Sequence, residues 1–273
     1  MPELPEVETV IRGLKEKITG KIIREVTLRR ADLRIPFPEN LAGNLAGRKI
    51  ISLARRAKYI LMHLDDSNII IAHLGMSGKI MMLEKGYKPQ KHDHALISFN
   101  SGDIMVFNDP RRFGLLTLTR KKDLQTHKLF KSLGAEPLSP EFTGKTLHGI
   151  LKNKNTNIKN ALMDQNFVVG VGNIYAAESL YLAGISPLRS SKKINSAESA
   201  RLAAAIKTVL NSAIKAGGST ISDYRTATGK NGQFQLKFQV YGRKGKKCLK
   251  CQDIIEAIRQ NGRSSFYCPS CQS

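Results

Sequence analysis

The sequence predicts an α+β protein of several parts: an N-terminal β-sandwich or barrel led by one α-helix, a helical middle, and a small cysteine-containing C-terminal module. Three observations support this prediction. Strand-sized apolar runs fill residues 21–109, apolar residues at helical spacing fill residues 143–218, and all four cysteines follow residue 247. A length of 273 residues with 41% hydrophobic content is sufficient for one large core or two modest ones.

The first predicted element is an amphipathic helix over residues 5–18, where apolar residues recur three and four positions apart. Pro5 suits the first turn of a helix, and the carboxylate of Glu6 complements the positive end of the helix dipole. Pro2 and Glu3 lie before this helix, so helix formation does not account for them.

Strand patterns follow the helix. The segment "NSGD" at residues 100–103 indicates a hairpin turn between two of these strands. The strands are predicted within residues 21–30, 48–64, 67–75, 78–84, 94–100 and 103–109.

From about Leu133 the pattern becomes helical, and a Pro-containing connection leads into it. After this region, the polar residues 219–233 predict a mobile loop. The remaining tail has the pattern of short strands and turns. Helices are predicted within residues 143–153, 157–165, 173–184 and 196–218.

The charge balance favours a polyanionic partner. Lys and Arg together number 44 against 22 Asp and Glu, which gives a formal net charge of +22 and a pI of about 10.0. The apolar runs are strand-sized, so nucleic acid is favoured over a membrane surface. The first residues lack the pattern of a signal peptide, and we therefore expect a reducing compartment in which disulfides are rare.

The four cysteines form two CxxC pairs, Cys248 with Cys251 and Cys268 with Cys271. Two such pairs with a strand-sized gap are typical of one tetrahedral Zn²⁺ held by four thiolates, a closed and therefore structural site. Free thiols or two disulfides are the alternatives. Basic residues precede and flank the first pair, and contact with phosphates is the favoured interpretation.

Three stretches carry a specific resemblance: "MPELPEVET" at the start, "VVGVGNIYAAESL" in the middle, and "CLKC" with "GRSSFYCPSCQ" at the end. With them, the chain resembles bacterial formamidopyrimidine-DNA glycosylases along its whole length. Leu4 and the segment "DPRRFG" favour this family over the related endonuclease VIII family, which prefers oxidised pyrimidines. The resemblance implies three domains: a catalytic β-sandwich at 1–132, a helix–two-turn–helix domain with a lesion-capping loop at 133–233, and a zinc-ribbon-like finger at 234–273.

For Pro2 the resemblance implies the nucleophile. Once Met1 is removed, its secondary amine would attack the sugar C1′, displace the damaged base and form an iminium, whose charge makes strand cleavage by elimination possible. An α-amine has a pKa near ~8, and the adjacent helix end would lower it. Glu3 would be the general acid and base at the sugar, and Glu6 either lines the same site or only caps the helix.

The resemblance also implies residues that hold the DNA. Lys58 would contact phosphate and assist elimination, although a lone lysine in a strand is more often surface charge. Arg263, expected on a tight turn after Gly262, would grip the phosphates beside the lesion. The further DNA-contacting positions implied are His92, Lys154 and Asn173, the last in the turn that "VGVGN" opens.

A flipped base leaves a gap that side chains must fill. The resemblance assigns this task to Met76 in "HLGMSG" and to Arg111 and Phe113 in "DPRRFG", with the arginine contacting the orphaned cytosine. Without the resemblance, core packing would be the favoured role of Met76 and Phe113. Both segments carry glycine beside these residues, where a side chain can protrude.

These expectations combine into a bifunctional glycosylase and abasic-site lyase that acts as a monomer in the bacterial cytoplasm. Its partner would be double-stranded DNA containing 8-oxoguanine, a ring-opened purine or an abasic site, and its only cofactor one structural Zn²⁺. Two alternatives stay open: an endonuclease VIII-like glycosylase for oxidised pyrimidines, and a basic zinc-finger protein that binds DNA without catalysis. Ser264, Ser265 and Ala177 depart from the common family pattern and leave the finer lesion preference open.

Overall fold

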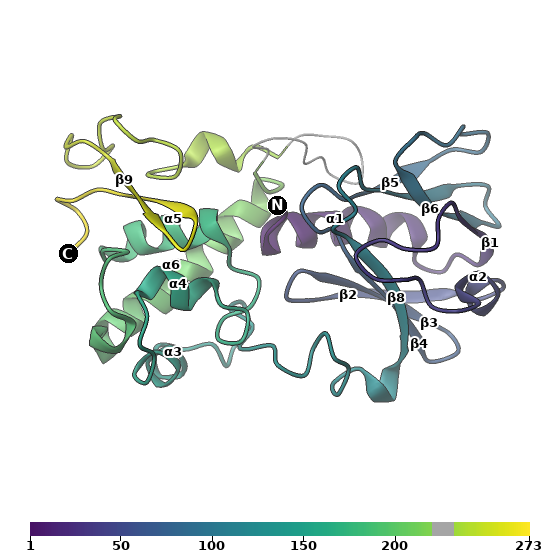
Figure 1. Ribbon diagram of the computed structural model, residues 1–273, viewed down its shortest axis with the longest axis horizontal. Coiled ribbons are helices and arrows are strands. Elements are labelled where there is room, and N and C mark those ends of the chain that lie inside the picture. Colours follow the sequence, from purple (N-terminus) through teal and green to yellow (C-terminus); the bar gives the residue numbers. More distant parts are fainter. Residues whose placement is uncertain (220–231) are drawn as a thin grey trace. The chain divides into compact units, whose positions relative to one another are not determined.

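A computed structural model describes residues 1–219 and 232–273 of the chain (Figure 1). The chain forms two compact units. The first comprises Met1–Lys131 together with Gly217–Gln233, and the second comprises Ser132–Ala216 together with Phe234–Ser273. The predicted lesion-capping loop lies almost entirely outside the described residues. Separate domains for residues 133–233 and 234–273 stay a prediction.

Two four-stranded antiparallel sheets form the first unit, with strand orders β1-β6-β7-β5 and β2-β3-β4-β8. Inward-facing residues of both sheets, such as Ile97 and Ile70, share one hydrophobic core. This arrangement confirms the predicted β-sandwich. The strands are β1 (Ile23–Leu28), β2 (Ile50–Arg56), β3 (Tyr59–Leu64), β4 (Asn68–His73), β5 (Lys79–Leu83), β6 (Asp93–Phe99), β7 (Ile104–Asn108) and β8 (Leu115–Arg120).

Helix α1 (Leu4–Ile18) leads the sandwich, as the sequence predicts. It contacts β2, β3 and β5 along an apolar stripe. On its polar side the guanidinium of Arg55 in β2 lies 3.1 Å from the carboxylate of Glu8, which ties the first turns of the helix to the sheet. The buried residues of the stripe are Val7, Val10, Ile11, Leu14 and Ile18.

Two elements of the first unit are absent from the sequence-based prediction, and one predicted segment divides. Strand β8 and the short helix α2 (Leu41–Leu45) were not expected, and residues 48–64 form two strands rather than one. The break falls at Ala57, whose φ of 53° turns the chain between β2 and β3. Strand β8 depends on its pairing along the whole of β4, a long-range contact that a local pattern does not contain.

Two connections cross between the sheets side by side. Residues 74–78 lead from β4 to β5, and residues 109–114 lead from β7 to β8. Because β4 pairs with β8 and β5 pairs with β7, the two connections begin and end on neighbouring strands. We call them the 74–78 crossover and the 109–114 crossover.

The second unit contains four α-helices and one β-hairpin. Three of its helices begin at polar caps: Thr143 accepts from the backbone amide of Thr146, Asn157 from that of Asn160, and Asn195 from that of Glu198. The hairpin packs against α5 (Figure 1). The elements are α3 (Gly144–Leu151), α4 (Ile158–Met163), α5 (Asn173–Ala183), α6 (Ser196–Lys215), β9 (Glu256–Gln260) and β10 (Arg263–Tyr267), with short 3-10 turns η2 (Ser191–Lys193) and η3 (Phe234–Lys237). A further 3-10 turn, η1 (Lys121–Asp123), follows β8 in the first unit.

Candidate functional site

Two buried carboxylates, those of Glu3 and Glu6, lie at the start of α1. Pro2 is buried directly before the helix, and Glu3 and Glu6 are 3% and 2% exposed. The backbone N–H of Glu3 donates to Oε2 of Glu6 over 2.9 Å, which is half of a capping box. The other oxygen of Glu6 accepts from both the backbone N–H (2.8 Å) and the hydroxyl (3.1 Å) of Ser219. Glu6 therefore caps the helix and also fixes the residue from which the 220–231 segment departs.

Lys58 lies in the turn between β2 and β3 and is 8% exposed, so the surface-charge interpretation of this lysine is wrong. It lies near His73, the last residue of β4. Burial, together with the positive charges of Arg34 and Lys58, lowers the pKa of His73 to about 3. The imidazole is therefore neutral, and its Nδ1 accepts a hydrogen bond from the backbone N–H of Gly75 over 2.9 Å.

The crossovers expose the three predicted gap-filling side chains. Met76 is 41% and Phe113 43% exposed, so core packing does not describe either residue. The guanidinium of Arg111 lies 4.9 Å from the centre of the Phe113 ring. Between Arg111 and Phe113, the backbone of Arg112 has a φ of 59°, a left-handed conformation that is strained for a residue with a side chain.

His92 lies just before β6, beside the start of the 109–114 crossover. Its backbone carbonyl accepts from the amide of Asp109, and its ring is 6.4 Å from that of His94. Between the two histidines, Asp93 is buried and accepts from the hydroxyl of Tyr87 and the amide of Gln90. The "HDH" segment thus anchors the loop that carries His92.

In the second unit, Lys154 and Arg263 line one open cleft of about 530 Å³. The ammonium group of Lys154 lies 3.9 Å from the centre of the Phe167 ring, also part of the lining. Arg263 begins β10 directly after Asn261 and Gly262, both of which have positive φ, as a two-residue hairpin turn requires. The arginine is exposed at the tip of the hairpin, where its fork can reach an anion.

Asn173 is the first residue of α5, and its side chain is engaged within the protein. Its Oδ1 accepts from Nζ of Lys159 over 2.6 Å, and its Nδ2 donates to the carbonyl of Ser264. The side chain therefore joins α5 to the Arg263 hairpin rather than pointing freely at a ligand.

Lys159 is a buried lysine at the candidate site that the sequence did not point to. It is 1% exposed, and its ammonium group also donates to the carbonyl of Ser264 (2.9 Å) and the hydroxyl of Ser265 (2.7 Å). These bonds connect α4, α5 and β10 at the residues that follow Arg263. The available signal was its place on the apolar side of α4, beside Ile158 and Leu162, where a lysine needs partners.

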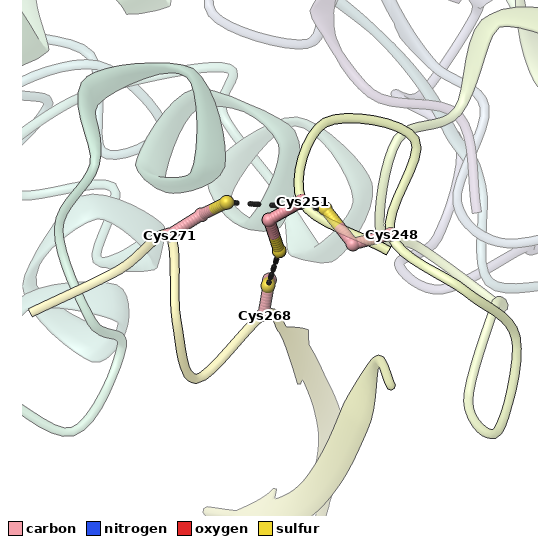
Figure 2. Close-up of side chains that lie close together, drawn as sticks. All are labelled: Cys248, Cys251, Cys268 and Cys271. Atoms are coloured by element: carbon pink, nitrogen blue, oxygen red, sulfur yellow. Dashed lines mark hydrogen bonds between the residues drawn. The ribbon is translucent and has the colours of Figure 1, made fainter. Parts of the chain in front are cut away.

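The four cysteines converge from two loops at the base of the β9-β10 hairpin (Figure 2). Their Sγ atoms all lie within 4.8 Å of one another, with Cys251 and Cys268 at 3.4 Å and Cys248 and Cys271 at 3.9 Å. Tetrahedral Zn²⁺ with Zn–S bonds of about 2.3 Å separates its sulfurs by roughly 3.8 Å, so the four thiolates fit this ion. The set is complete without water, and the zinc site is structural.

Helix α5 supports the zinc site from behind. The hydroxyl of Tyr181 lies 3.2 Å from Sγ of Cys248, and Ala177 packs into the same small core as Cys248 and Cys268. Glu178 is 3% exposed and accepts from three consecutive backbone amides, those of residues 239–241, at 2.9, 3.0 and 2.8 Å. Burial raises the pKa of Glu178 in spite of these three donors.

Comparison with known proteins matches each part of the chain. Residues 1–116 match the formamidopyrimidine-DNA glycosylase N-terminal domain, and residues 133–225 match the H2TH domain of the same enzymes. Residues 245–273 match the zinc finger found in FPG and IleRS. Among the described residues, no helix is long and apolar enough to cross a membrane.

Whole-chain comparisons agree with the domain matches. A formamidopyrimidine-DNA glycosylase of Dinoroseobacter shibae is 47% identical, with all of both chains covered. A crystal structure of a Lactococcus lactis Fpg mutant with Fapy-dG-containing DNA has a TM-score of 0.92, and one of the wild-type L. lactis enzyme with oxidised-pyrimidine-containing DNA has 0.91; both are 34% identical and fully covered. Because the 47% identity extends over the whole chain and all three domains match in order, this chain belongs to the formamidopyrimidine-DNA glycosylase family of base-excision repair enzymes.

Proposed function

We propose that this protein excises 8-oxoguanine and formamidopyrimidines from duplex DNA, with Pro2 as the nucleophile, and then cleaves the strand by successive β- and δ-elimination. One observation carries the assignment of the nucleophile. Pro2 is buried and precedes Glu3, the buried cap residue at the positive end of α1, whose backbone N–H donates to the buried carboxylate of Glu6. The proposal requires removal of Met1, so that the proline nitrogen is a free secondary amine.

The chemistry balances without a redox partner. The lone pair of the proline nitrogen forms a bond to C1′, and the glycosidic bond breaks with its electrons leaving on the base, which takes up a proton. The nitrogen then loses its proton, and its electron pair forms the C=N bond as the C1′–O4′ bond breaks and O4′ takes up a proton. The resulting iminium has no N–H to lose and draws electrons from C2′. Loss of a C2′ proton then expels the 3′ phosphate, and a second elimination expels the 5′ phosphate. The positive helix end disfavours the protonated amine and so favours attack.

Glu3 is proposed as the general acid and base at the sugar, because its carboxylate is adjacent to the nucleophile in the chain and withdrawn from bulk water. Glu6 is proposed as a positioning residue. Its two oxygens accept from the backbone amide of Glu3 and from Ser219, so it links the nucleophile's neighbour to Ser219. Lys58 is proposed to contact phosphate from the β2-β3 turn.

The second unit is proposed to hold the DNA backbone. Lys154 and Arg263 place two positive charges on one cleft, and an arginine at a hairpin tip suits bidentate contact with phosphate oxygens. Asn173 is proposed to act from within, through Lys159 and Ser264, by fixing the base of that hairpin. His92 is proposed as a further phosphate contact from the first unit.

Met76, Arg111 and Phe113 are proposed to fill the gap left by the flipped nucleotide. Their side chains are exposed, and they lie on the two crossovers, which connect neighbouring strands. The guanidinium of Arg111 has the hydrogen-bond donors that the acceptor atoms of an unpaired cytosine require. We further propose that the protein acts as a monomer in the bacterial cytoplasm, with the three domains assigned above and the zinc finger as the structural support of Arg263.

Borohydride trapping tests the proposal. Zinc-loaded protein without Met1 is incubated with a duplex containing one 8-oxoguanine opposite cytosine, reduced, and mapped by mass spectrometry; we expect the DNA linked at Pro2. Pro2→Gly is compared with Pro5→Ala, which changes the neighbouring proline but leaves the terminal amine unchanged. An absent cross-link, or one at any other residue, would refute the assignment of the nucleophile.

A second substrate class has a specific observation in its favour, since the L. lactis relative was crystallised with oxidised-pyrimidine-containing DNA. The same assay with thymine glycol in place of 8-oxoguanine compares the two classes. Faster single-turnover excision of 8-oxoguanine supports the purine assignment, and faster excision of thymine glycol replaces it.

A further inference from the structure

The 74–78 and 109–114 crossovers touch backbone to backbone. A Cβ atom on Gly75 would lie 2.3 Å from the carbonyl carbon of Phe113, and one on Gly114 would lie 2.8 Å from the carbonyl oxygen of His73. Contacts this short exclude any side chain at either glycine. The backbones of the two segments that carry Met76 and Phe113 are therefore in direct contact.

One carboxylate joins the two crossovers. Asp109 is 0% exposed; its Oδ1 accepts from the hydroxyl of Ser77 over 2.7 Å, and its Oδ2 accepts from the backbone N–H of Gly114 over 2.7 Å. The hydroxyl of Ser77 in turn accepts from the backbone N–H of Arg111 over 3.2 Å. Neither crossover can move relative to the other without breaking one of these bonds.

The two hydrogen bonds explain why a carboxylate occupies this position, whereas burial alone would disfavour one. A fully buried negative charge is costly, and both of its oxygens here accept from uncharged donors. Asparagine has the same size but accepts at one end only; if its oxygen keeps the bond from Gly114, its NH₂ group faces Ser77, and the hydroxyl proton of Ser77 loses its acceptor. The backbone around Asp109 is also fixed: its carbonyl accepts from Nε2 of His94 (2.9 Å) and from the amide of the strained Arg112.

We propose that Asp109, acting with Ser77, is a positioning residue that holds Met76 at a fixed distance from Arg111 and Phe113, so that the three side chains enter the DNA as one preformed wedge. The inference rests on the proposed function, in which these side chains fill the gap left by the flipped base. It adds the two residues that determine their spacing.

Base excision and abasic-site cleavage should respond differently when the spacing of Met76, Arg111 and Phe113 is no longer fixed. Excision requires a stacked, paired 8-oxoguanine to be displaced, and a preorganised wedge lowers that cost. Cleavage at a preformed abasic site has no base to displace. Loss of the Asp109 bridge should therefore slow excision much more than it slows the lyase reaction.

Single-turnover rates of Asp109→Asn on 8-oxoguanine and abasic-site duplexes test this expectation. We expect excision to fall by about tenfold, the effect of one lost hydrogen bond of about 1.4 kcal/mol, with abasic-site cleavage within about twofold of wild type. Asp66→Asn is the matched control. Asp66 also accepts from one backbone amide and one side chain, both of Asn68, at the opposite end of β4. It forms in addition an ion pair with Arg48 (3.1 Å), and its variant should excise at the wild-type rate.

If Asp109→Asn does not fold, substitutions of the half-buried Ser77 provide a second test. Ser77→Ala should slow excision by about threefold or more and Ser77→Thr, which keeps the hydroxyl, should restore it. Wild-type excision by Asp109→Asn or, if that variant does not fold, by Ser77→Ala overturns the inference. Equal loss of both activities in a folded Asp109→Asn also overturns it, because a general structural defect would then suffice.

Failure of the proposed function is distinguishable from failure of the inference. If wild-type protein neither excises 8-oxoguanine nor forms the Pro2 cross-link, the function itself is wrong. If wild-type protein excises 8-oxoguanine, and Met76→Ala does not, while Asp109→Asn does, only the wedge-positioning role is wrong.

Discussion

Glu178 gives the sharpest stability prediction, because a single side chain organises the turn that leads into the zinc finger. Its Oε2 accepts from the amide of Gln239, and its Oε1 accepts from the amides of Val240 and Tyr241. In Glu178→Gln the remaining oxygen can keep the latter two, while the new NH₂ group faces the Gln239 N–H. One buried donor is then left unpaired, which costs about 1–3 kcal/mol of unfolding free energy.

Truncation should cost more. Glu178→Ala removes the acceptor for all three amides and leaves a void in a 3% exposed position, so we expect a loss of about 3 kcal/mol or more. For a unit of this size, the glutamine variant should lower the unfolding temperature by roughly 3–10 °C. The same loosening should accelerate release of Zn²⁺, because the turn and Cys248 share one small core.

Calorimetry of the zinc-loaded protein and the rate of zinc release to a chromogenic chelator provide the two readouts. Glu256→Gln is the control: Glu256 is an exposed finger carboxylate that accepts from a single hydroxyl, that of Tyr267, and its variant should change the unfolding free energy by under ~1 kcal/mol. If Glu178→Gln matched wild type in both readouts, the three-amide bridge would not stabilise the finger.

Three further predictions follow from the site. Removal of zinc should unfold residues 245–273, because structural zinc contributes about 10–16 kcal/mol in small modules, and circular dichroism with and without a chelator measures the loss. His73 has its pKa lowered to about 3, so its neutral form is favoured by folding; the stability it contributes is present above pH ~6.5 and lost as the pH falls toward 3, about 2 kcal/mol of it between pH 7 and pH 5. An NMR titration in which His73 protonates near pH 6.5 would contradict this. Arg263→Ala should weaken DNA binding and reduce the slope of log K against log salt by about 1, and an unchanged slope would mean that Arg263 contacts no phosphate.

Local signals accounted for much of the molecule. The apolar spacing of residues 5–18 specified α1, since that helix buries one stripe against a sheet. The CxxC pairs specified the zinc site, since two tight turns bring four thiolates to one point whatever the rest of the fold does. Positions such as Pro2 and Arg263 were assigned through family resemblance, and their roles stay proposals.

The missed features depend on partners that are distant in the sequence. Strand β8 forms through its pairing with β4. The roles of Asp109 and Lys159 depend on hydrogen bonds from or to Ser77 and Ser265, which lie on other segments of the chain. A buried polar residue in a sequence shows no partner, because hydrogen bonds between distant segments leave no periodic trace. The exposure of Met76 and Phe113 likewise required the folded crossovers, since both residues are apolar.

The side-by-side crossovers also affect the order in which the protein folds. The pairing that brings them together joins Asn68 to Arg120 and His73 to Leu115, so a long loop must close before either crossover meets the other. Non-local pairings of this kind form slowly, and sandwiches dominated by them have high contact order. The wedge is therefore complete only after this long-range pairing has formed, and a chain that has not completed the pairing can carry the nucleophile's helix without being able to open DNA.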